Sequence, residues 1–287
     1  MKFGIILNYE NYQQTIVCSN SLLKAGMDKV IIVDNVSKNN SFYKLEEYAA
    51  RIMNVSVILN KENNGYARGN NFGLEYIENT FGLSEENVVY IINPDSFVSR
   101  EIVDAIRNFI INTPKSGAVT TLINNTMKST WHHMTPRRAF IFNSWCIRWL
   151  LMKFGIREEI SYDLTDKIFQ PVDVVMGAFF GIKQVTFKSV GYFDEGTFLY
   201  YEEEALYAKL KQRGVQNYIL NTMSFEHLGR GSTALNKIAF KRINDNSRNY
   251  VLKKYYKVGK IYLSFSRMVN HIDNTLLILL NRKKIKR

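Results

Sequence analysis

A short apolar run, Val88–Ile92, restricts the fold of this chain more than any other segment. It reads Val-Val-Tyr-Ile-Ile and is rich in β-branched side chains. Such a run is typical of a parallel strand covered on both faces, because an exposed face would carry polar residues at alternate positions. Pro94 follows and has no N–H to donate, so strand pairing must end there. The chain is therefore predicted to contain a central strand whose carboxyl end carries Asp95.

Strands and helices are expected to alternate through the first 125 residues. Helical stretches are predicted at about 12–23, 41–51, 67–79 and 99–111, between apolar strands at 3–7, 29–33, 55–59, 88–92 and 118–122. This order predicts an α/β fold with a mostly parallel central sheet. Ligands of such sheets bind beyond the carboxyl ends of the strands. Because Asp34 also follows a strand, the two acids outline a nucleotide-diphosphate site.

The second half of the chain is less regular. Residues 124–162 mix aromatic and basic side chains, and we interpret them as an insertion that is mobile or faces an acceptor. A strand pair with a glycine bend is predicted within 172–182, followed by a helix near 183–190. A further helix should begin at Glu202 and end at Arg213, with Gly214 as its cap. Strand 217–220 and a loop containing His227 come next, and the last 50 residues are expected to be helical and basic.

Composition sets broad limits on the class of protein. The 287 residues are 46% hydrophobic and 22% charged, which suits one large domain with an appendage. The net charge of +12 is compatible with nucleic acid, an anionic membrane or phosphorylated substrates. Cys18 and Cys146 form no CxxC pair, which indicates a reducing compartment. The start of the chain does not resemble a signal peptide and no run approaches about 18 apolar residues, so a cytoplasmic protein is expected.

A series of short motifs resembles the family 2 inverting glycosyltransferases, especially the rhamnosyltransferase-like branch of bacterial polysaccharide biosynthesis. The resemblance extends over about residues 1–233. The motifs are Val33-Asp34-Asn35 with Ser37, Asn64-Gly65-Tyr66-Ala67 with Gly69-Asn70-Asn71-Phe72-Gly73, Asn93-Pro94-Asp95, Gly177-Ala178, Gly191-Tyr192-Phe193-Asp194-Glu195, Phe198-Leu199-Tyr200-Tyr201-Glu202-Glu203, and His227 before Gly229 and Ser232.

The resemblance implies a GT-A fold, a Rossmann-like nucleotide-sugar-binding domain with a mostly parallel central sheet. We expect this domain at residues 1–235, with a nucleotide-binding half at 1–125 and an acceptor-binding half at 126–235. Residues 236–287 would then form a helical, basic C-terminal extension.

The predicted contacts to the nucleotide sugar lie in four segments. Asp34 is expected to expose its carboxylate at the sheet edge and to accept the N3–H of uracil or thymine; the alternative is an Asx turn. Gly65 and Arg68 open a helix whose free N–H groups favour anions, although Asn63 or Asn64 could simply cap it. The full set is Asn8, Asp34, Asn35, Asn64, Gly65, Arg68, Asn71, Asn93 and Asp95.

Asp95 and His227 are the predicted metal ligands. A divalent cation, Mn²⁺ or Mg²⁺, would neutralise the diphosphate leaving group. The usual Asp-x-Asp of the family has Asn93 at its first position here, so the site has one charge less. A helix cap or turn role for Asp95 and a structural role for His227 are the alternatives. His132 and His133 lack partners at metal-site spacing and are interpreted as loop residues.

Glu202 and Glu203 are the predicted catalytic residues. At a helix start the macrodipole keeps carboxylates ionised, which suits a base that takes the acceptor proton during inverting attack on C1. By the resemblance Glu203 aligns with the catalytic aspartate. Ala205 stands where many relatives have another aspartate, which leaves open which glutamate acts. The predicted acceptor contacts are Trp131, Gly177, Asp194 and Glu195, with a turn cap as the alternative for Asp194.

The basic C-terminal stretch carries interleaved aromatic residues, which are Tyr250, Tyr255, Tyr256, Tyr262 and Phe265. It is either a solvated basic face or an amphipathic surface that lies on anionic lipid and holds a lipid-linked acceptor. The combined hypothesis is a metal-dependent inverting transferase, peripheral at the inner face of the cell membrane. It would move rhamnose or a hexose from a nucleotide-diphosphate sugar to a lipid-linked oligosaccharide of a surface polysaccharide such as capsule or O-antigen.

Two other classes of protein are kept as alternatives. One is a non-catalytic subunit of a polysaccharide assembly complex, for which Asn93 and Ala205 leave room. The other is a basic nucleic-acid-binding protein, which has no need of Asp34, Asp95 and Glu203 at strand and helix ends. Nucleic acid is therefore not expected as a partner.

Overall fold

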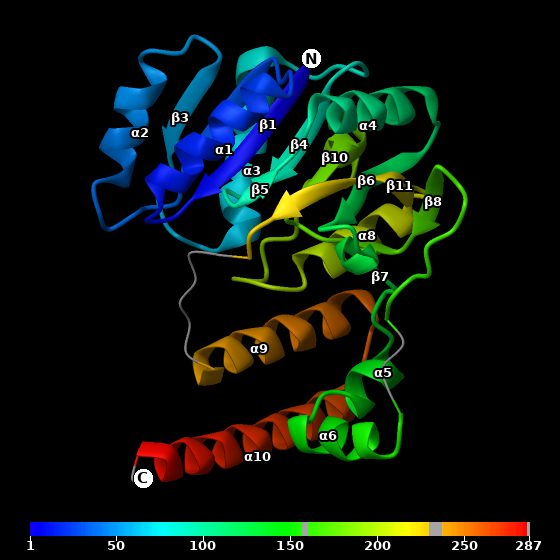
Figure 1. Ribbon diagram of the computed structural model, residues 1–287. Helices are drawn as coiled ribbons and strands as arrows, with labels where there is room; N and C mark the ends of the chain where they lie inside the picture. Colours follow the sequence, from blue (N-terminus) through cyan, green and yellow to red (C-terminus); the bar gives the residue numbers. More distant parts are fainter. Residues whose placement is uncertain (157–159, 230–236, 286–287) are drawn as a thin grey trace.

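A mixed β-sheet forms the centre of the computed structural model, which describes residues 1–156, 160–229 and 237–285. Ser232, the expected boundary at 235–236 and the last two residues lie outside these ranges. Within them, the main sheet has nine strands in the order β3-β2-β1-β4-β10-β6-β11-β5, with β8 paired to β11. Helices cover both faces of the sheet (Figure 1).

The first half follows the predicted alternation closely. Strands β1–β4 run parallel, and the predicted bounds of β3 and β4 are confirmed to the residue. The elements are β1 (Lys2–Asn8), α1 (Tyr12–Lys24), β2 (Lys29–Asp34), α2 (Ser41–Ala49), β3 (Val55–Leu59), α3 (Tyr66–Phe81), β4 (Val88–Ile92), β5 (Ser96–Phe97), α4 (Arg100–Asn112) and β6 (Ser116–Ile123).

Two predictions about the second half are wrong. Residues 172–182 do not form a strand pair, because β9 pairs with β7 while β10 inserts antiparallel between β4 and β6. His227 is not in a loop but ends the long strand β11. The elements are η1 (Met127–Ser129), β7 (Thr130–Trp131), α5 (Pro136–Ile141), α6 (Trp145–Lys153), β8 (Phe169–Val172), β9 (Val174–Val175), β10 (Phe179–Lys183), α7 (Gln184–Ser189), α8 (Glu202–Gln212) and β11 (Gln216–His227).

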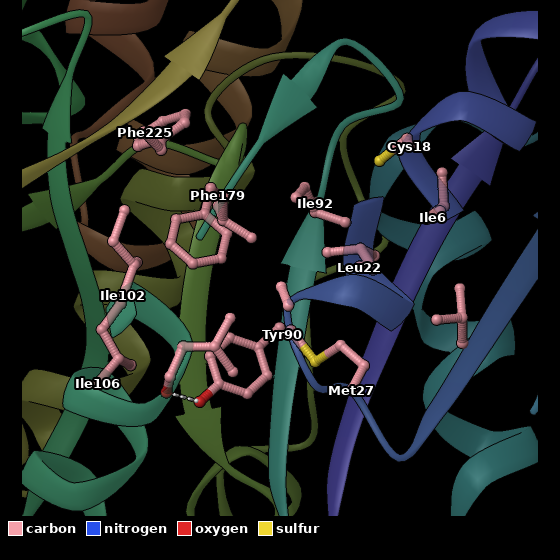
Figure 2. Packing of buried hydrophobic residues seen from close by; sticks show 14 of the residues in the cluster. Ile6, Cys18, Leu22, Met27, Tyr90, Ile92, Ile102, Ile106, Phe179 and Phe225 are labelled. Carbon is pink, nitrogen blue, oxygen red and sulfur yellow. Dashed lines mark hydrogen bonds between the residues drawn. The ribbon is translucent and has the colours of Figure 1, made fainter. Parts of the chain in front are cut away.

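The core lies on both faces of the sheet, as the apolar run Val88–Ile92 predicts. All five residues of β4 are buried. On one face Tyr90 packs among Ile102 and Ile106 of α4, and its hydroxyl donates a hydrogen bond of 2.7 Å to the carbonyl of Val103 (Figure 2). Helices α3, α7 and α8 cover the other face. Burying a side chain of this size stabilises the fold by about 1.5–3 kcal/mol. The packed core on both faces therefore fixes the position of the strands and of the residues at their carboxyl ends.

Strand β11 changes register part-way along β6. Leu220 lies opposite Thr121, but Ser224 lies opposite the next residue, Leu122, so the residues between them form a bulge. Beyond the bulge β11 pairs antiparallel with β5, which places His227 opposite Ser96. This irregular strand therefore brings His227 beside the turn that follows β4.

The C-terminal segment is helical, as predicted, with α9 (Lys237–Tyr255) and α10 (Lys260–Ile285). Helix α9 lies beneath the sheet-containing body, while α10 and α6 lie on the far side of α9 (Figure 1). Of the helices described, none combines the length and the apolar character that crossing a bilayer requires.

A glycine joins the start of α3 to the segment before α8. Gly65 has φ +95°, and a Cβ atom there would lie 1.8 Å from the carbonyl oxygen of Phe198. That oxygen accepts a hydrogen bond of 3.0 Å from the N–H of Tyr66. Only glycine permits this approach, because any side chain would displace Phe198 as well as adopt a disfavoured backbone angle.

We expect Gly65→Ala to lower the free energy of unfolding by roughly 2–4 kcal/mol, since it adds a steric overlap to an unfavourable φ. Gly82→Ala is the matched control at the other end of α3, where φ is +73° and no atom lies within 4 Å of the added Cβ. The control should lose only about 1 kcal/mol. Equal losses in urea denaturation would contradict the importance of the Phe198 contact.

Candidate active site

Asp95 and His227 come together at the carboxyl edge of the sheet. Nε2 of His227 lies 3.2 Å from Oδ1 of Asp95, and the N–H of Leu228 donates to the backbone carbonyl of Asp95 at 3.0 Å. Asp95 is 4% exposed, and the His227 side chain is 21% exposed. The two predicted metal ligands, far apart in sequence, are therefore neighbours in a largely buried position.

The spacing of this pair fits one divalent ion. Two ligands at about 2.1 Å from an octahedral ion and at right angles to each other lie about 3 Å apart. Among the residues that the structure describes, no group of three or more His, Cys, Asp or Glu side chains converges on one point. The remaining ligands would then be phosphate oxygens and water, as is common where Mg²⁺ binds with a nucleotide.

Asp34 is fully buried, so the expectation that its carboxylate is exposed was wrong. Its oxygens accept hydrogen bonds from the Asn8 side chain at 2.7 Å, the Ser37 hydroxyl at 2.8 Å and the Ser37 N–H at 2.9 Å. The last of these ties the carboxylate to the backbone three residues on, so Asp34 caps its own turn, although not with the two-residue spacing of the Asx turn considered as the alternative. Asp34 and Asn8 therefore close the ends of β1 and β2, and contact with a base would require Ser37 to move.

The segment between β3 and α3 is held by asparagine side chains. Asn35 accepts a hydrogen bond from Asn60 and donates to Asn63, both at 2.9 Å, and the N–H of Gly65 donates to Asn63 at 3.2 Å. Asn64 instead bonds the exposed Glu62 at 2.8 Å. Asn35 and Gly65, both predicted to bind the nucleotide sugar, are thus held by one set of side-chain bonds, while Asn64 bonds a different residue of the same segment.

Arg68 and Glu195 lie beside a cavity of about 300 Å³ on the outer side of α3. Nε of Arg68 is 3.9 Å from the Glu195 carboxylate, and its side chain is 54% exposed. The cavity is lined by Asn60, Lys61, Glu62, Asn64, Arg68, Phe72, Glu75 and Glu195. Neither the Asp95–His227 pair nor Glu203 lines it, so it is separate from the predicted metal site.

Asn71 links α3 to the loop that contains Asp194 and Glu195. Its side chain accepts from the N–H of Phe193 at 3.0 Å and donates to the Phe193 carbonyl at 3.1 Å and to Glu195 at 2.9 Å. The amide group is buried and both its ends are engaged. In this structure Asn71 connects the two halves of the domain rather than pointing toward the Asp95 turn.

Glu203 lies next to the strand end that carries Asp95. The N–H of Asn93 donates to the carbonyl of Ala178 at 2.9 Å, and the N–H of the adjacent Gly177 donates to Oε1 of Glu203 at 3.0 Å. The Gly177 carbonyl accepts from the Tyr66 hydroxyl at 2.6 Å. Gly177 therefore connects the predicted base to the start of α3, and a Cβ on it would crowd both Glu203 and Tyr66.

The paired glutamates have shifted acidities. Burial, and then the charge of Glu203, raise the pKa of Glu202 well above its ordinary value, and Oε2 of Glu202 has no hydrogen-bond partner among the described residues. Burial also raises the pKa of Glu203, against opposing backbone hydrogen bonds. Two carboxylates this close do not both ionise readily, so the pair retains a proton more easily than either would alone.

The turn that presents these glutamates is strained. Tyr200 and Tyr201 both have φ of +69°, a left-handed conformation that non-glycine residues rarely adopt. Each such residue costs on the order of 1–3 kcal/mol and persists where surrounding contacts enforce it, frequently at active sites. The same segment contacts Gly65 through the Phe198 carbonyl, two residues before Tyr200.

Glu204 is a residue that sequence reasoning missed. It accepts hydrogen bonds from Trp131 Nε1 and from the N–H of Met134, each at 3.1 Å. Burial raises the pKa of Glu204 to about 7, although hydrogen bonds from Met134 and Trp131 oppose the shift. The predicted acceptor residue Trp131 is thus oriented by Glu204. In a run of three glutamates, no sequence signal distinguishes this one.

Asp194 faces helix α9 instead of open acceptor space. Its carboxylate accepts from Tyr250 at 2.8 Å, from Tyr255 and from Lys254 at 2.8 Å, and also from the N–H of Gly196 at 2.9 Å, the turn cap considered as the alternative. Burial alone would raise the pKa of Asp194, but these hydrogen bonds outweigh it and lower the pKa to about 2. Asp194 therefore attaches α9 to the body of the protein.

The family follows from a sequence comparison. Residues 5–191, more than half of the chain, match the family model described as "Glycosyl transferase family 2". The chain belongs to glycosyl transferase family 2. The resemblance noted from the motifs is confirmed at this level, while the rhamnosyltransferase branch stays a prediction.

Several known proteins are similar to this family 2 glycosyltransferase in sequence or in structure. "Low-salt glycan biosynthesis hexosyltransferase Agl10" of Haloferax volcanii is 24% identical over 199 residues, 69% of this chain and 58% of the relative. The structure of GalNAc-T7 with UDP, GalNAc and Mn²⁺ has a TM-score of 0.62 at 13% identity and covers 89% of this chain and 49% of that one. The mannosyltransferase PcManGT from Pyrobaculum calidifontis, solved with GDP-Man and Mn²⁺, has a TM-score of 0.57 at 14% identity, covering 95% and 70%.

These structural likenesses confirm the GT-A fold with its mostly parallel mixed sheet. This family 2 glycosyltransferase spans 58% of the length of Agl10 and about half of GalNAc-T7.

Asp194→Asn should lower the free energy of unfolding by about 2 kcal/mol near neutral pH. The folded-state pKa of Asp194 is below the ordinary 3.8, so the carboxylate stabilises the fold above that pH and the benefit is lost as the pH falls toward 2. The gap between variant and wild type in urea denaturation should therefore shrink in acid. Asp104→Asn, at an ion pair whose aspartate is 44% exposed, should lose less than about 1 kcal/mol. Equal losses in both variants would contradict the anchoring role.

Proposed function

We propose that this chain is an inverting glycosyltransferase that moves a sugar from a nucleotide-diphosphate donor to an acceptor hydroxyl. The observation that supports this most directly is the position of Glu203. Glu203 is a partly exposed residue whose carboxyl has a raised pKa, and it is tied through Gly177 to the strand end that carries Asp95 and His227. A base and a candidate diphosphate site thus share one edge of the sheet, as the transfer requires.

In the proposed reaction, Glu203 accepts the proton of the acceptor hydroxyl while that oxygen attacks C1 of the sugar from the face opposite the leaving group. Glu203 suits this role better than Glu202, because the N–H of Gly177 stabilises its ionised form. Glu202 is nearly fully buried and would hold the proton of the pair. Its neutral form spares Glu203 a neighbouring negative charge.

Asp95 and His227 would hold the divalent metal, Mn²⁺ or Mg²⁺. When bound, such an ion supplies positive charge that stabilises the diphosphate as the sugar departs. The spacing of the pair supports this assignment, and two structures with the same fold were solved with Mn²⁺. Asn93 brings no charge, so Asp95 is the one carboxylate of the Asn93-Pro94-Asp95 motif.

The finer assignments rest on the family resemblance and on the named relatives. We propose rhamnose or a hexose as the donor sugar and a lipid-linked oligosaccharide as the acceptor, in the synthesis of a surface polysaccharide. Residues 1–125 would bind the donor, residues 126–235 would shape the acceptor side, and 236–287 would form the extension. Binding at the anionic inner face of the cell membrane would bring the enzyme to a lipid-linked acceptor.

Glu203→Gln should reduce transfer by a factor of about 10²–10⁴ and leave donor binding nearly unchanged, because it removes only the proton acceptor. Glu202→Gln is the matched variant in the same turn. It should retain most of the activity, since Glu202 is already neutral in the proposed state. For both variants the rate of sugar transfer is measured in an activity assay, and nucleotide binding is measured by calorimetry. Normal turnover by Glu203→Gln would refute the base assignment, and a loss confined to Glu202→Gln would transfer the role to that residue.

Asp95→Asn should abolish the part of the thermal stabilisation by UDP, GDP or dTDP that depends on Mn²⁺, since ligand binding to the folded state raises the apparent stability. Asp104→Asn, a surface aspartate on α4, should keep the full metal-dependent shift. Melting temperatures are compared with and without Mn²⁺. An unchanged shift in Asp95→Asn would mean that the ion binds elsewhere.

A further inference from the structure

Helix α10 is amphipathic in the reverse sense of an ordinary surface helix. Its buried positions include Ser266, Asn270 and Asp273, all 6% exposed or less. Its exposed positions carry large apolar side chains at helical spacing. These are Ile261, Phe265, Met268, Ile272, Leu276 and Leu279. A helix that borders water normally buries its apolar face, so the outer face of α10 is suited to an apolar environment.

The buried polar face has its own partners, so the orientation of α10 is fixed by specific bonds. Ser144 donates to Asp273 at 2.8 Å, Arg248 on α9 donates to Asn270 at 3.2 Å, and Ser266 donates to Asn249 at 2.9 Å. Rotating α10 to bury its apolar stripe would break these bonds and leave Asp273 without its partners. The outward stripe is therefore a consequence of the packing.

Helix α6 lies next to α10. Ser144, which caps α6, bonds Asp273 of α10, and both helices lie on the side of α9 remote from the sheet (Figure 1). The apolar side chains on and next to α6 are largely exposed. These are Ile147, Trp149, Leu150, Met152 and Phe154. We call the exposed apolar residues of α6 and α10, together with Phe154, the α6/α10 face.

The two stretches of sequence that carry most of the α6/α10 face are basic. Residues 134–156 contain four basic residues and no acidic one, and residues 246–272 contain basic residues and no Asp or Glu. Arg148, Lys153 and Arg267 are exposed on the two helices, whereas Asp273, the acidic residue of α10, is buried. A second copy of the same face would meet it with like charge, which disfavours a symmetric dimer.

We propose that the α6/α10 face docks on an anionic lipid bilayer, with both helices lying in the interface. Apolar side chains enter the headgroup boundary while the surrounding Lys and Arg contact anionic headgroups. Trp149, with Lys153 3.9 Å over its ring, has the amphipathic character of interfacial tryptophans. This inference deepens the proposed function, because it defines the surface that would bring the enzyme to a lipid-linked acceptor.

The assignment differs from that expected for the C-terminal extension as a whole. Tyr250 and Tyr255 on α9 bond Asp194, and Tyr256 bonds Glu204. These tyrosines face the body of the enzyme and are not on the docking surface. The surface instead combines α10 with α6, a helix from the middle of the chain.

The test is co-sedimentation of the full chain with vesicles of phosphatidylcholine containing phosphatidylglycerol, without nucleotide sugar. Met268→Glu should weaken binding about tenfold or more, because it replaces an inserting side chain with a charge that anionic headgroups repel. Met53→Glu is the matched control on the turn before β3, where Met53 is 92% exposed. It should bind like the wild type. Met268 is 51% exposed, so its variant should fold, and an unchanged melting temperature confirms this.

A charge pair completes the test. Arg267→Gln should weaken binding to anionic vesicles, while Arg213→Gln, at the exposed end of α8, should not. Equal sedimentation of Met268→Glu and wild type would overturn the proposal. The proposal would also be overturned if the wild type formed a dimer, the dimer dissociated in Met268→Glu, and the wild type did not bind vesicles.

Donor binding in solution is measured separately by calorimetry. If it fails while the vesicle results follow the expected pattern, the proposed function falls and the docking surface stands. If the donor binds normally but the vesicle results do not follow the expected pattern, the docking surface is refuted and the proposed function stands.

Discussion

The structure depends on one close approach between its halves, where the start of α3 meets the turn before α8. Gly65 leaves room for the Phe198 carbonyl, and Tyr66 bonds both that carbonyl and Gly177. Gly177 in turn holds Glu203. Because each of these contacts uses backbone atoms, their geometry depends on chain path more than on flexible side chains. The strained Tyr200 and Tyr201 lie in the same turn, between Phe198 and Glu203.

The two C-terminal helices have different surroundings: α9 contacts the sheet-containing body, and α10 lies on the outer side of α9 (Figure 1). Helix α9 is attached to the sheet-containing body, since Asp194 holds three of its side chains and Ser247 donates to the Leu199 carbonyl at 2.8 Å. Helix α10 buries Leu263 together with the polar Ser266, Asn270 and Asp273, and turns large apolar groups outward. A buried layer that includes Asp245 and Arg248 therefore separates a conventional apolar core from an outer apolar face. Ordinary hydrophobic packing alone does not explain such a layering.

Much of the fold was predictable because buried parallel strands leave uninterrupted apolar runs, and β3 and β4 match their predicted bounds. Strand β11 was cut short because polar residues from Asn221 to Glu226 hide its second half. The neighbours of β10 in the sheet could not be predicted, because its apolar sequence is compatible with pairing to any other buried strand. Within the site, the proximity of Asp95 and His227 was anticipated through family resemblance. The burial of Asp34 beneath Ser37 and the turning of Asp194 toward Tyr250 depend on side-chain partners, which a single sequence does not reveal.

The bulge in β11 has a consequence for how such a chain can vary in length. Side chains alternate between the faces of a strand, so removing one residue between Ser224 and the end of β11 would turn the imidazole of His227 away from Asp95. Asn221, within the bulge, also bonds the carbonyls of Thr165 and Lys167. Because these bonds hold residues 165–167 against β11, residues added shortly before position 165 would not shift the strand. Insertions and deletions among descendants of this sequence should therefore accumulate ahead of β8 and be excluded from the final residues of β11.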